Sequence, residues 1–385
     1  MRQPGFRNAA HFPLKFAEVH VSHSDAPSAE CAFPPENFGR SLNIIDPLTD
    51  ARWDELVSRH PKASAFHRRG WLAALKQTYG YEPFAMTSAA PGEPLEDGFV
   101  ACRIRSWLTG TRIVSLPFTD HCDPLVSDTA GERRLLERMI EEARRGSCSY
   151  LEFRPLSASP GVEIGFQPGD TYCFHELDLA PGLDELYKGL HKDSIRRKIR
   201  RAEESQLSYE AGCTNEFVET FYHLLLMTRR RHQLPPQPKT WFRNLVRQMG
   251  DAARIRVARK DGAAIAAILT LRHRSKVIYK YGCSDGAFHP LGGMPFLFWK
   301  LIEESKVSGA ESIDFGRSAI GNEGLIAFKS KFGAAKRILT YLRYPRANKQ
   351  NAGDWGDSRL ARRVFSILPD GVLSAAGKVL YKHIG

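Results

Sequence analysis

The chain has 385 residues, of which 42% are hydrophobic and 25% charged, proportions typical of a globular protein with more than one domain. Its net charge of +12 suits a nucleic acid, an anionic membrane surface or a phosphorylated substrate as partner. The seven cysteines form no C-x-x-C pair, which argues against a metal site or a disulfide framework and favours a reducing compartment. We find no signal-peptide core and no apolar run of about 18 residues, so we expect a cytoplasmic protein that attaches to a membrane at most peripherally.

Residues 1–40 are rich in Pro, Ser, Ala and His and show no hydrophobic period, which predicts a poorly ordered arm. The next segment, residues 41–172, reads as a first structured half. Its predicted strands are 42–45, 83–87, 99–105, 112–116 and 150–153, and its predicted helices are 51–59, 70–79 and 131–145.

Residues 173–346 read as a second half with the same order of elements: a strand, two helices, several antiparallel strands, a helix and a strand. Its predicted strands are 174–179, 207–210, 254–259, 264–272, 276–282, 313–315 and 337–344. Its predicted helices are 183–205, 216–232, 240–249 and 295–307, followed by a short helix before the last strand. Asp261-Gly262 between apolar runs predicts a hairpin. The order predicts a duplicated α/β (α+β) unit, each copy a mixed, mostly antiparallel sheet flanked by helices.

The segment from Ser312 to Gly333 carries the strongest chemical signal. A short buried strand, 313–315, is expected to end at Gly316, which leaves Arg317 at the mouth of the strand, where ligands of α/β folds often bind. On the following helix Phe328 and Phe332 share a face beside Lys329. Two cations at the end of a strand predict a site for an anionic ligand. The alternative for Lys329 is a solvated helix residue.

Three further groups are candidates, each with a structural alternative. Asp120 and His121 follow a strand, and either could act as the general base on an acceptor amine; the alternative is a turn that Asp120 caps. Arg196 and Arg200 share a face of a basic helix that could attract a phosphate-bearing acceptor, or could simply be solvated. Tyr281, on an alternating strand, could orient an acceptor sugar or belong to the core. No arrangement of metal ligands is apparent.

The element order resembles the GNAT acyltransferase fold. The runs Gly292-Gly-Met-Pro-Phe-Leu-Phe-Trp-Lys300, Asp314-Phe-Gly-Arg-Ser318 and Phe328-Lys-Ser-Lys-Phe-Gly333 resemble the FemAB-like branch, which includes peptidoglycan aminoacyl transferases and BioF2-like acetyltransferase domains. Phe66-His-Arg-Arg-Gly-Trp71 and residues 115–125 resemble FemAB-like proteins found with exopolysaccharide export systems. The resemblance covers about residues 42–345 and implies two tandem GNAT-like domains, 41–172 and 173–346.

The resemblance assigns roles to single residues. Lys329 matches the lysine that stabilises developing charge in the peptidoglycan transferases, where acyl transfer to an amine passes through an oxyanion. Gly292, Gly293 and Met294 lie where GNAT enzymes cradle the coenzyme A pyrophosphate on backbone N–H groups. This loop departs from the usual glycine pattern, and a plain turn into a helix is the alternative.

The resemblance implies transfer of an acyl group from acyl-CoA, without a metal, to an amine or hydroxyl of a cell-envelope sugar, polysaccharide or peptide precursor. One alternative is an aminoacyl-tRNA donor, the one case in which a nucleic acid would be a partner. Another alternative is a non-catalytic assembly factor for exopolysaccharide export. The remaining residues, 347–385, form a basic amphipathic tail that either docks onto its own domain or lies on an anionic membrane surface.

Overall fold

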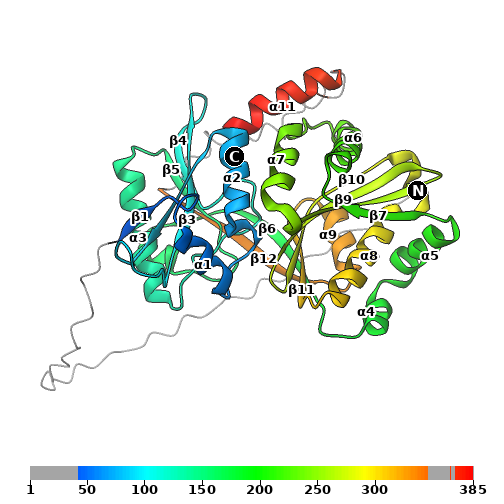
Figure 1. The fold of residues 1–385 in the computed structure, drawn as a ribbon, viewed down its shortest axis with the longest axis horizontal. Coiled ribbons are helices and arrows are strands. Elements are labelled where there is room, and N and C mark those ends of the chain that lie inside the picture. Colours follow the sequence, from blue (N-terminus) through cyan, green and yellow to red (C-terminus); the bar gives the residue numbers. More distant parts are fainter. Residues whose placement is uncertain (1–41, 346–364, 366–368, 385) are drawn as a thin grey trace, which may run out of the picture. The chain divides into compact units, whose positions relative to one another are not determined.

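The computed structural model describes residues 42–345, 365 and 369–384. The first half of the chain forms five strands and three α-helices and leads into a long sixth strand (Figure 1). These elements are β1 (Asn43–Ile45), α1 (Ala51–Arg59), α2 (Arg69–Tyr79), β2 (Glu82–Thr87), β3 (Phe99–Ser106), β4 (Gly110–Val114), α3 (Thr129–Arg145), β5 (Tyr150–Phe153) and β6 (Gln167–Asp178), with 3-10 turns at Ala65–His67 and Pro160–Ile164.

The second half repeats this order and adds a C-terminal helix. It contains α4 (Leu183–Gly189), a π-turn (Lys192–Arg196), α5 (Arg197–Glu204), β7 (Ser208–Gly212), α6 (Asn215–Arg231), α7 (Lys239–Met249), a 3-10 turn (Gly250–Ala252), β8 (Ala253–Lys260), β9 (Ala263–His273), β10 (Lys276–Ser284), a 3-10 turn (Gly286–Leu291), α8 (Gly293–Val307), β11 (Ser312–Ala319), α9 (Glu323–Ser330), β12 (Ala335–Tyr344) and α11 (Asp370–Ile384).

The twelve strands of the described residues join one mixed sheet in the order β1-β2-β3-β4-β5-β12-β6-β11-β10-β9-β8-β7. The last strand, β12, pairs with β5 of the first half and with β6, and β6 in turn pairs with β11. The two halves therefore exchange strands at the centre of the sheet. The predicted boundary between residues 172 and 173 falls inside β6.

Among the described residues, three large apolar cores and one small cluster around Phe174 cover the sheet. The largest is built from both halves, because α1 and α2 pack with α6 and α7 on one face; Trp71 and Trp241 meet edge to face at 5.2 Å there. Figure 1 shows α2 and α7 side by side in the middle of the molecule. A second core lies under α4, α5 and α8, and a third lies under α3. The shared core fixes the two halves against each other.

Local sequence signals account for several element ends. The side chains of Asp50, Asp128 and Asn322 accept hydrogen bonds from backbone N–H groups at the starts of α1, α3 and α9, as good N-cap residues do. The predicted Asp261-Gly262 hairpin is confirmed: it joins β8 to β9, with φ angles of 50° and 81° at the two turn residues.

Two predicted elements are wrong in detail. The expected helix 183–205 is broken: α4 ends at Gly189, Leu190 is extended and buried, and the chain restarts in the π-turn. The strand expected to end at Gly316 runs on to Ala319 as β11. Gly316 sits at a bulge, where the register against β6 shifts between Asp314 and Arg317. A glycine with φ of 69° bends this strand without ending it.

The C-terminal helix α11 packs on the body of the protein, which agrees with the docking alternative for the tail. Tyr81 Oη donates to the carbonyl of Tyr381 at 2.7 Å, and Leu373 is fully buried. The basic residues 359, 362 and 363 of the predicted tail lie outside the described residues. Among the described residues, no helix combines the length and the apolar character that a membrane crossing requires.

Candidate functional site

The candidate site lies where two parallel strands part. β10 and β11 pair only from Lys276 and Ser312 to Ile278 and Asp314, although both strands continue beyond that point. Each is irregular just there: β10 shifts register against β9 between Tyr279 and Tyr281, and β11 carries the bulge at Gly316. Diverging strands with bulges leave backbone groups free to face a ligand.

Lys329, on α9, lies across this opening. Its Nζ donates to the carbonyl oxygens of Gly316 and Arg317, both at 3.0 Å, and the residue is 2% exposed. Phe328 and Phe332 flank it as predicted, with ring centroids 5.1 Å apart. Burial lowers the pKa of Lys329 to about 8, against the opposing attraction of Asp120 and Asp314. An ammonium has three N–H donors, so one of them is left for a ligand.

Asp120 and His121 reach this opening from the first half of the chain. They lie on the connection 115–128, which runs from β4 to α3, and both are buried. Tyr341 of β12 holds the connection in place, because its hydroxyl donates to the carbonyl of Asp120 at 2.8 Å. A Cβ atom on Gly316 would lie 3.0 Å from Asp120 Oδ2. The glycine at the bulge therefore makes room for the carboxylate.

Asp120 is paired with two cations. Lys280 Nζ lies 3.1 Å from Asp120 Oδ2, and Arg317 Nε lies 3.6 Å from Oδ1. Burial raises the pKa of Asp120, but Lys280 and Arg317 outweigh this and hold it below its usual value. Burial lowers the pKa of Lys280. A carboxylate held ionised between two cations is a poor proton acceptor and a good positioning group.

His121 is paired with Asp314 of β11. His121 Nε2 lies 3.0 Å from Asp314 Oδ2, and Asp314 Oδ1 accepts from the backbone N–H of Gly316 at 2.5 Å. Burial lowers the pKa of His121, but the hydrogen bond to Asp314 and the negative charges of Asp314, Asp123 and Asp120 together outweigh burial and raise the pKa above its usual value. The carboxylate fixes the ring and makes it a stronger base, the arrangement that general-base catalysis requires.

We call these residues the Lys329 cluster: Asp120, His121, Lys280, Asp314, Arg317 and Lys329. It combines three cations, Lys280, Arg317 and Lys329, with two carboxylates, Asp120 and Asp314, and places His121 beside them. The cluster therefore carries a positive excess in a largely buried place. Such an excess favours negative charge that develops on a substrate, because buried charges are weakly screened.

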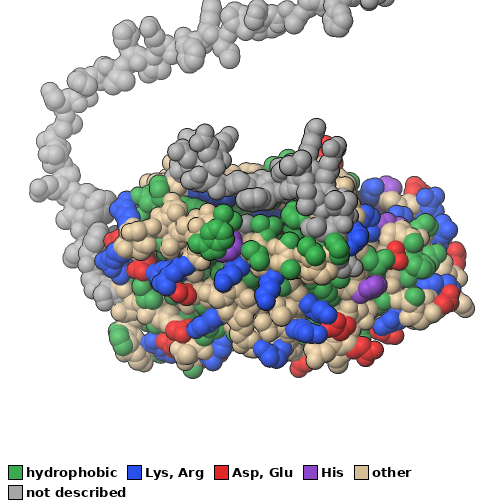
Figure 2. All heavy atoms as spheres, turned by 90° about the horizontal axis from the view of Figure 1, so that it is seen from above, with side chains coloured by type: hydrophobic (Ala, Val, Ile, Leu, Met, Phe, Trp, Pro, Cys, Tyr) green, Lys and Arg blue, Asp and Glu red, His purple; other side chains and the backbone are tan. Residues whose placement is uncertain are grey.

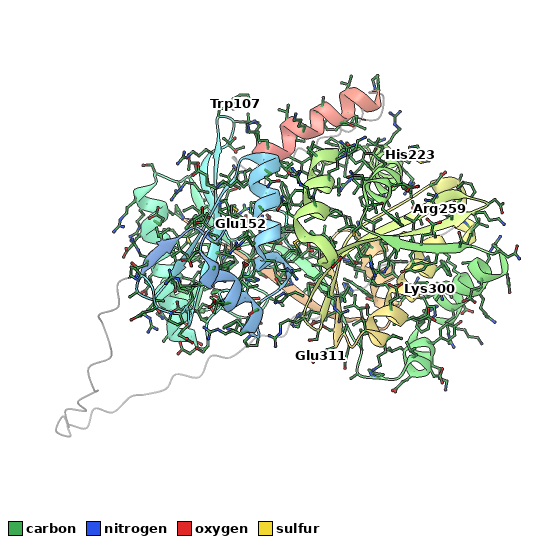
Figure 3. All side chains as sticks on the ribbon, in the orientation of Figure 1. Trp107, Glu152, His223, Arg259, Lys300 and Glu311 are labelled. Atoms are coloured by element: carbon green, nitrogen blue, oxygen red, sulfur yellow. The ribbon has the colours of Figure 1, made fainter. Side chains whose placement is uncertain are left out.

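In the first half, the place that corresponds to the opening between β10 and β11 lies between β4 and β5, and an ion-pair network fills it. There β4 and β5 pair in parallel, and the buried carboxylate of Glu152 pairs with Arg154 and Arg343, both at 2.7 Å. Arg154 also donates to the carbonyl of Leu116, which seals the start of the 115–128 connection. Burial raises the pKa of Glu152, but the two arginines lower it to about 2. Figure 3 labels Glu152 in the interior of the first half. This network leaves no free cation there to face a ligand among the described residues.

The structure places the other predicted residues outside the Lys329 cluster or at its edge. Tyr281 lies at the edge: Lys280 Nζ is 5.5 Å from its ring, but its hydroxyl accepts from Trp241 Nε1 in the core. Arg196 is half-buried in the π-turn and Arg200 is exposed on α5, and no contact among the described residues joins either one to the cluster. Arg200 thus fits the solvated alternative, whereas the Nε atom of Arg196 is buried without a hydrogen-bond partner among the described residues.

Gly292, Gly293 and Met294 form the start of α8. A Cβ on Gly292 would lie 2.4 Å from the carbonyl oxygen of Lys198 on α5, so packing already requires glycine at this position. Gly293 is buried against Ile265 and Ala266 of β9. Met294 reaches β10, where a Cβ on Gly282 would lie 3.0 Å from its Cε. The loop is therefore next to the strand that carries Lys280.

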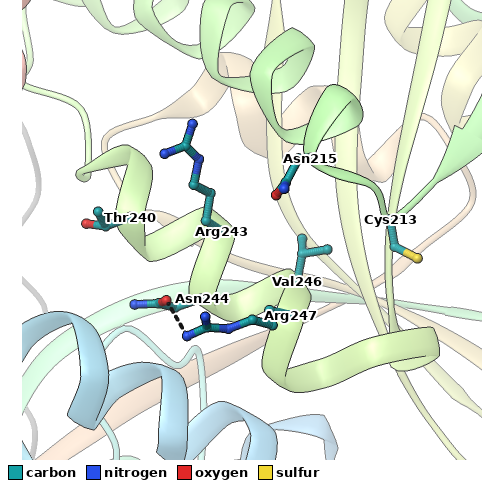
Figure 4. A pocket seen from close by; sticks show the side chains of 7 residues that line it. All are labelled: Cys213, Asn215, Thr240, Arg243, Asn244, Val246 and Arg247. Atoms are coloured by element: carbon teal, nitrogen blue, oxygen red, sulfur yellow. Dashed lines mark hydrogen bonds between the residues drawn. The ribbon is translucent and has the colours of Figure 1, made fainter.

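Two cavities lie away from the cluster. The larger, of about 670 Å³, opens beside α7 and the start of α6 (Figure 4). It is lined by Cys213, Asn215, Thr240, Arg243, Asn244, Val246 and Arg247. The smaller, of about 340 Å³, lies beside β6 and β12 and is lined partly by Glu176 and Asp178. In the described ranges no group of His, Cys, Asp or Glu is arranged to hold a metal ion.

Sequence reasoning missed two residues of the cluster, Asp314 and Lys280. Lys280 is the one for which the sequence held a signal. It lies between Tyr279 and Tyr281, in a stretch that reads as a regular alternating strand, and a solvated lysine fits that pattern. The bulge turns its side chain inward instead, over the rings of Phe66 and Tyr281. A lysine between two aromatic residues on a central strand was the available signal.

Comparisons with known proteins agree with this geometry. Residues 190–330 match the family model of the GNAT acetyltransferase domain. A search of curated proteins gave no match. Among solved structures, the chain is similar to FemX, with a TM-score of 0.63 at 15% identity over 77% of this chain and 95% of that one.

Two further solved structures are similar in fold. One is the C-terminal domain of a putative lysylphosphatidylglycerol synthetase from Agrobacterium fabrum, with a TM-score of 0.54 at 17% identity over 77% of this chain and 90% of that one. The other is L-PGS from Bacillus licheniformis, with a TM-score of 0.54 at 14% identity over 78% and 92%. The family match shows that residues 190–330 form a GNAT-type acetyltransferase domain, and the similar structures show that the chain has a FemX-like fold.

Proposed function

We propose that this protein transfers an acyl group from acyl-CoA to an amine, or to a hydroxyl, of a cell-envelope sugar, polysaccharide or peptide precursor. The observation that carries the proposal is the buried Lys329 ammonium at the point where β10 and β11 part. Two of its three N–H donors bond backbone carbonyls, and the third has no hydrogen-bond partner in the described part of the chain. Attack on an acyl carbonyl creates an oxyanion, and a preformed cation in a dry site stabilises it without reorganisation.

Each member of the Lys329 cluster has a role in this proposal. Lys329 faces the developing oxyanion. His121, oriented by Asp314, takes the proton that the acceptor amine loses as its nitrogen bonds to the acyl carbon and the carbon–sulfur bond breaks. Asp120 positions Lys280 and Arg317, whose charges attract the anionic parts of donor or acceptor. Tyr281 borders the acceptor side.

The start of α8 supports an anionic donor. Gly293 and Met294 offer backbone N–H groups at the helix N-terminus, where phosphate groups bind well, although Pro295 has none. Two cations, Arg231 and Lys198, lie near the turn before α8. Together with burial, their charges lower the pKa of His289 in that turn. These residues fit the pyrophosphate of coenzyme A without any metal.

The donor is the first point to test. Purified protein is incubated with acetyl-CoA or longer acyl-CoA and a panel of amino sugars, nucleotide sugars and peptidoglycan precursors, and products are followed by mass spectrometry and by free-thiol release. We expect an acyl mass shift together with release of coenzyme A. Transfer that occurs only with aminoacyl-tRNA would replace the donor in this proposal, and inactivity with both donors would contradict it.

Acceptors of this class are made from cytoplasmic precursors, and we therefore propose a cytoplasmic location for the protein. Polysaccharide precursors for export are one acceptor class in the panel. Attachment to the inner membrane is a separate question with its own structural basis.

A further inference from the structure

The C-terminal helix α11 is fixed in one rotation on the body of the protein. A Cβ on Gly377 would lie 2.0 Å from the carbonyl oxygen of Pro236, so the helix lies almost in backbone contact with the loop before α7. Leu373 is fully buried, and the ring of Tyr381 packs on that of Phe118 at 5.9 Å. These contacts decide which face of α11 points outward.

The end of α11 is tied to the hairpin between β3 and β4. The carbonyl of His383 accepts from the buried Arg112 at 2.7 Å and from Thr109 Oγ1 at 3.0 Å, which satisfies the helix C-terminus. Ser106 Oγ lies 2.9 Å from His383 Nδ1 and accepts from the backbone N–H groups of Leu108 and Thr109. The hairpin tip and the helix therefore form one rigid unit.

This unit displays apolar side chains outward. Trp107, at the hairpin tip, is 84% exposed, although its ring centroid lies only 5.5 Å from that of His383. Leu108 is 43% exposed, and Val372 and Val379 on α11 are 50% and 60% exposed. Figure 3 places Trp107 at the tip, on the side of the molecule where α11 lies. A tryptophan fixed in water costs free energy unless another phase or partner covers it.

The charges around these side chains are basic. Lys378 and Lys382 flank Val379 on the outer face of α11, and no carboxylate among the described residues pairs with either of them. The acidic residue of the helix, Asp370, is at the opposite end from the hairpin. Figure 2 views this side of the molecule and shows hydrophobic side chains gathered between scattered Lys and Arg side chains.

We propose that the Trp107–α11 surface, composed of Trp107, Leu108, Val372, Lys378, Val379 and Lys382, docks on an anionic lipid bilayer. Tryptophan prefers the membrane–water interface, and lysines beside it gain from the negative surface potential. The net charge of +12 favours the same partner. The chain would then lie on the membrane with its Lys329 cluster free to act, so docking is independent of the chemistry proposed for the cluster.

The test is co-sedimentation of the full chain with vesicles of phosphatidylglycerol and phosphatidylethanolamine, and with vesicles of phosphatidylcholine alone. We expect binding to the anionic vesicles, falling with salt. Trp107→Ser should weaken vesicle binding about tenfold, because the variant loses the large apolar side chain that the wild type would bury in the bilayer. Lys378→Glu with Lys382→Glu should weaken it by at least roughly fivefold for each lysine.

Matched controls lie elsewhere on the surface. Val307→Ser removes an 82% exposed valine at the end of α8, and Lys188→Glu reverses an exposed lysine on α4. Both should bind vesicles as the wild type does, and near-ultraviolet circular dichroism should show all variants folded. Binding that is equal for the two vesicle types, or unchanged in Trp107→Ser, would overturn the proposal. So would a lipid-free dimer that Trp107→Ser dissociates, because the surface would then be covered by a second copy.

Discussion

At the scale of single residues, Lys329 is a buried cation that gives up its proton more readily than a lysine in water. Its two carbonyl partners keep the ammonium in place, while burial lowers its pKa to about 8. At neutral pH it remains mostly charged, which oxyanion stabilisation requires. The same burial of a charged group lowers the free energy of unfolding.

The cost of burying the charged Lys329 should appear in how the free energy of unfolding changes with pH. The pKa of Lys329 is lowered in the folded state, so the unfolded chain binds its proton more tightly and the free energy of unfolding rises with pH. From pH 7 to pH 9.5 this gain should be about 2 kcal/mol, and Lys329→Met should lack it. Urea unfolding of both proteins at the two pH values isolates the difference, because other titrating groups cancel. Equal gains in both proteins would show that the lysine is not buried as a cation.

Asp120 should matter for stability as well as for activity. Asp120→Asn leaves Lys280 buried without its counter-charge, and we expect a loss of about 3–5 kcal/mol in the free energy of unfolding, since a lone buried charge is costly. Adding Lys280→Met should restore much of it.

The control is Glu303→Gln, which breaks the partly exposed ion pair with Lys300 on α8 and should cost less than about 1 kcal/mol. Urea denaturation measures all three variants. A loss in Asp120→Asn no larger than in the control would mean that Lys280 does not depend on the pair.

Sequence reasoning picked out Asp120, His121, Arg317 and Lys329 separately. The structure brings them together, although about 200 positions separate the first two from the others. The residues that pair with His121 and Asp120 in the structure could not be predicted from the sequence. Asp314 carries no pattern that distinguishes it from an ordinary strand residue. Lys280 stands between two tyrosines, but the bulge that turns its side chain inward leaves no mark on the hydrophobic period.

At the element scale, periodicity and turn residues predicted most strands and helices in their order. Gly316 shows the limit, because glycine marks both strand ends and bulges, and only pairing with β6 decides between them. Likewise, the break between α4 and α5 follows a glycine that helical periodicity alone reads through. Tertiary contacts settle such cases.

Gly292 offers a test of how α8 is placed. Gly292→Ala puts a Cβ against the carbonyl of Lys198, and the matched Gly309→Ala puts one into open space at a similar φ of 74°. Both pay the strain of a positive φ, but Gly292→Ala should lose about 1–3 kcal/mol more because it overpacks the contact between α5 and α8. Thermal or urea unfolding measures the difference. Equal losses would mean that the close approach is easily relieved.

On the scale of the whole molecule, the halves form one structural unit. β12 runs between β5 and β6, and the largest core is shared by helices from both halves. The sequence predicted the duplication, yet the strand exchange is invisible to it, because each strand alone has the same pattern whichever neighbour it joins. Because the strands are exchanged, the 115–128 connection of the first half lies against β11 and β12 of the second half.

A shared sheet and core should unfold together. We expect far-ultraviolet circular dichroism and tryptophan fluorescence to follow one coincident transition in urea, as in a single cooperative unit. Two separated transitions, one for each half, would show that β12 and the shared core do not bind the halves as the contacts suggest.

The most direct test of the Lys329 cluster compares two lysines two positions apart. Lys329→Met removes the buried cation, whereas Lys331→Met removes a half-buried one directly after the same helix. With the acceptor found above, we predict that kcat falls about 10²–10³-fold in Lys329→Met, the usual loss for one oxyanion donor, and stays within about twofold in Lys331→Met. Equal turnover by Lys329→Met and the wild type would contradict the account.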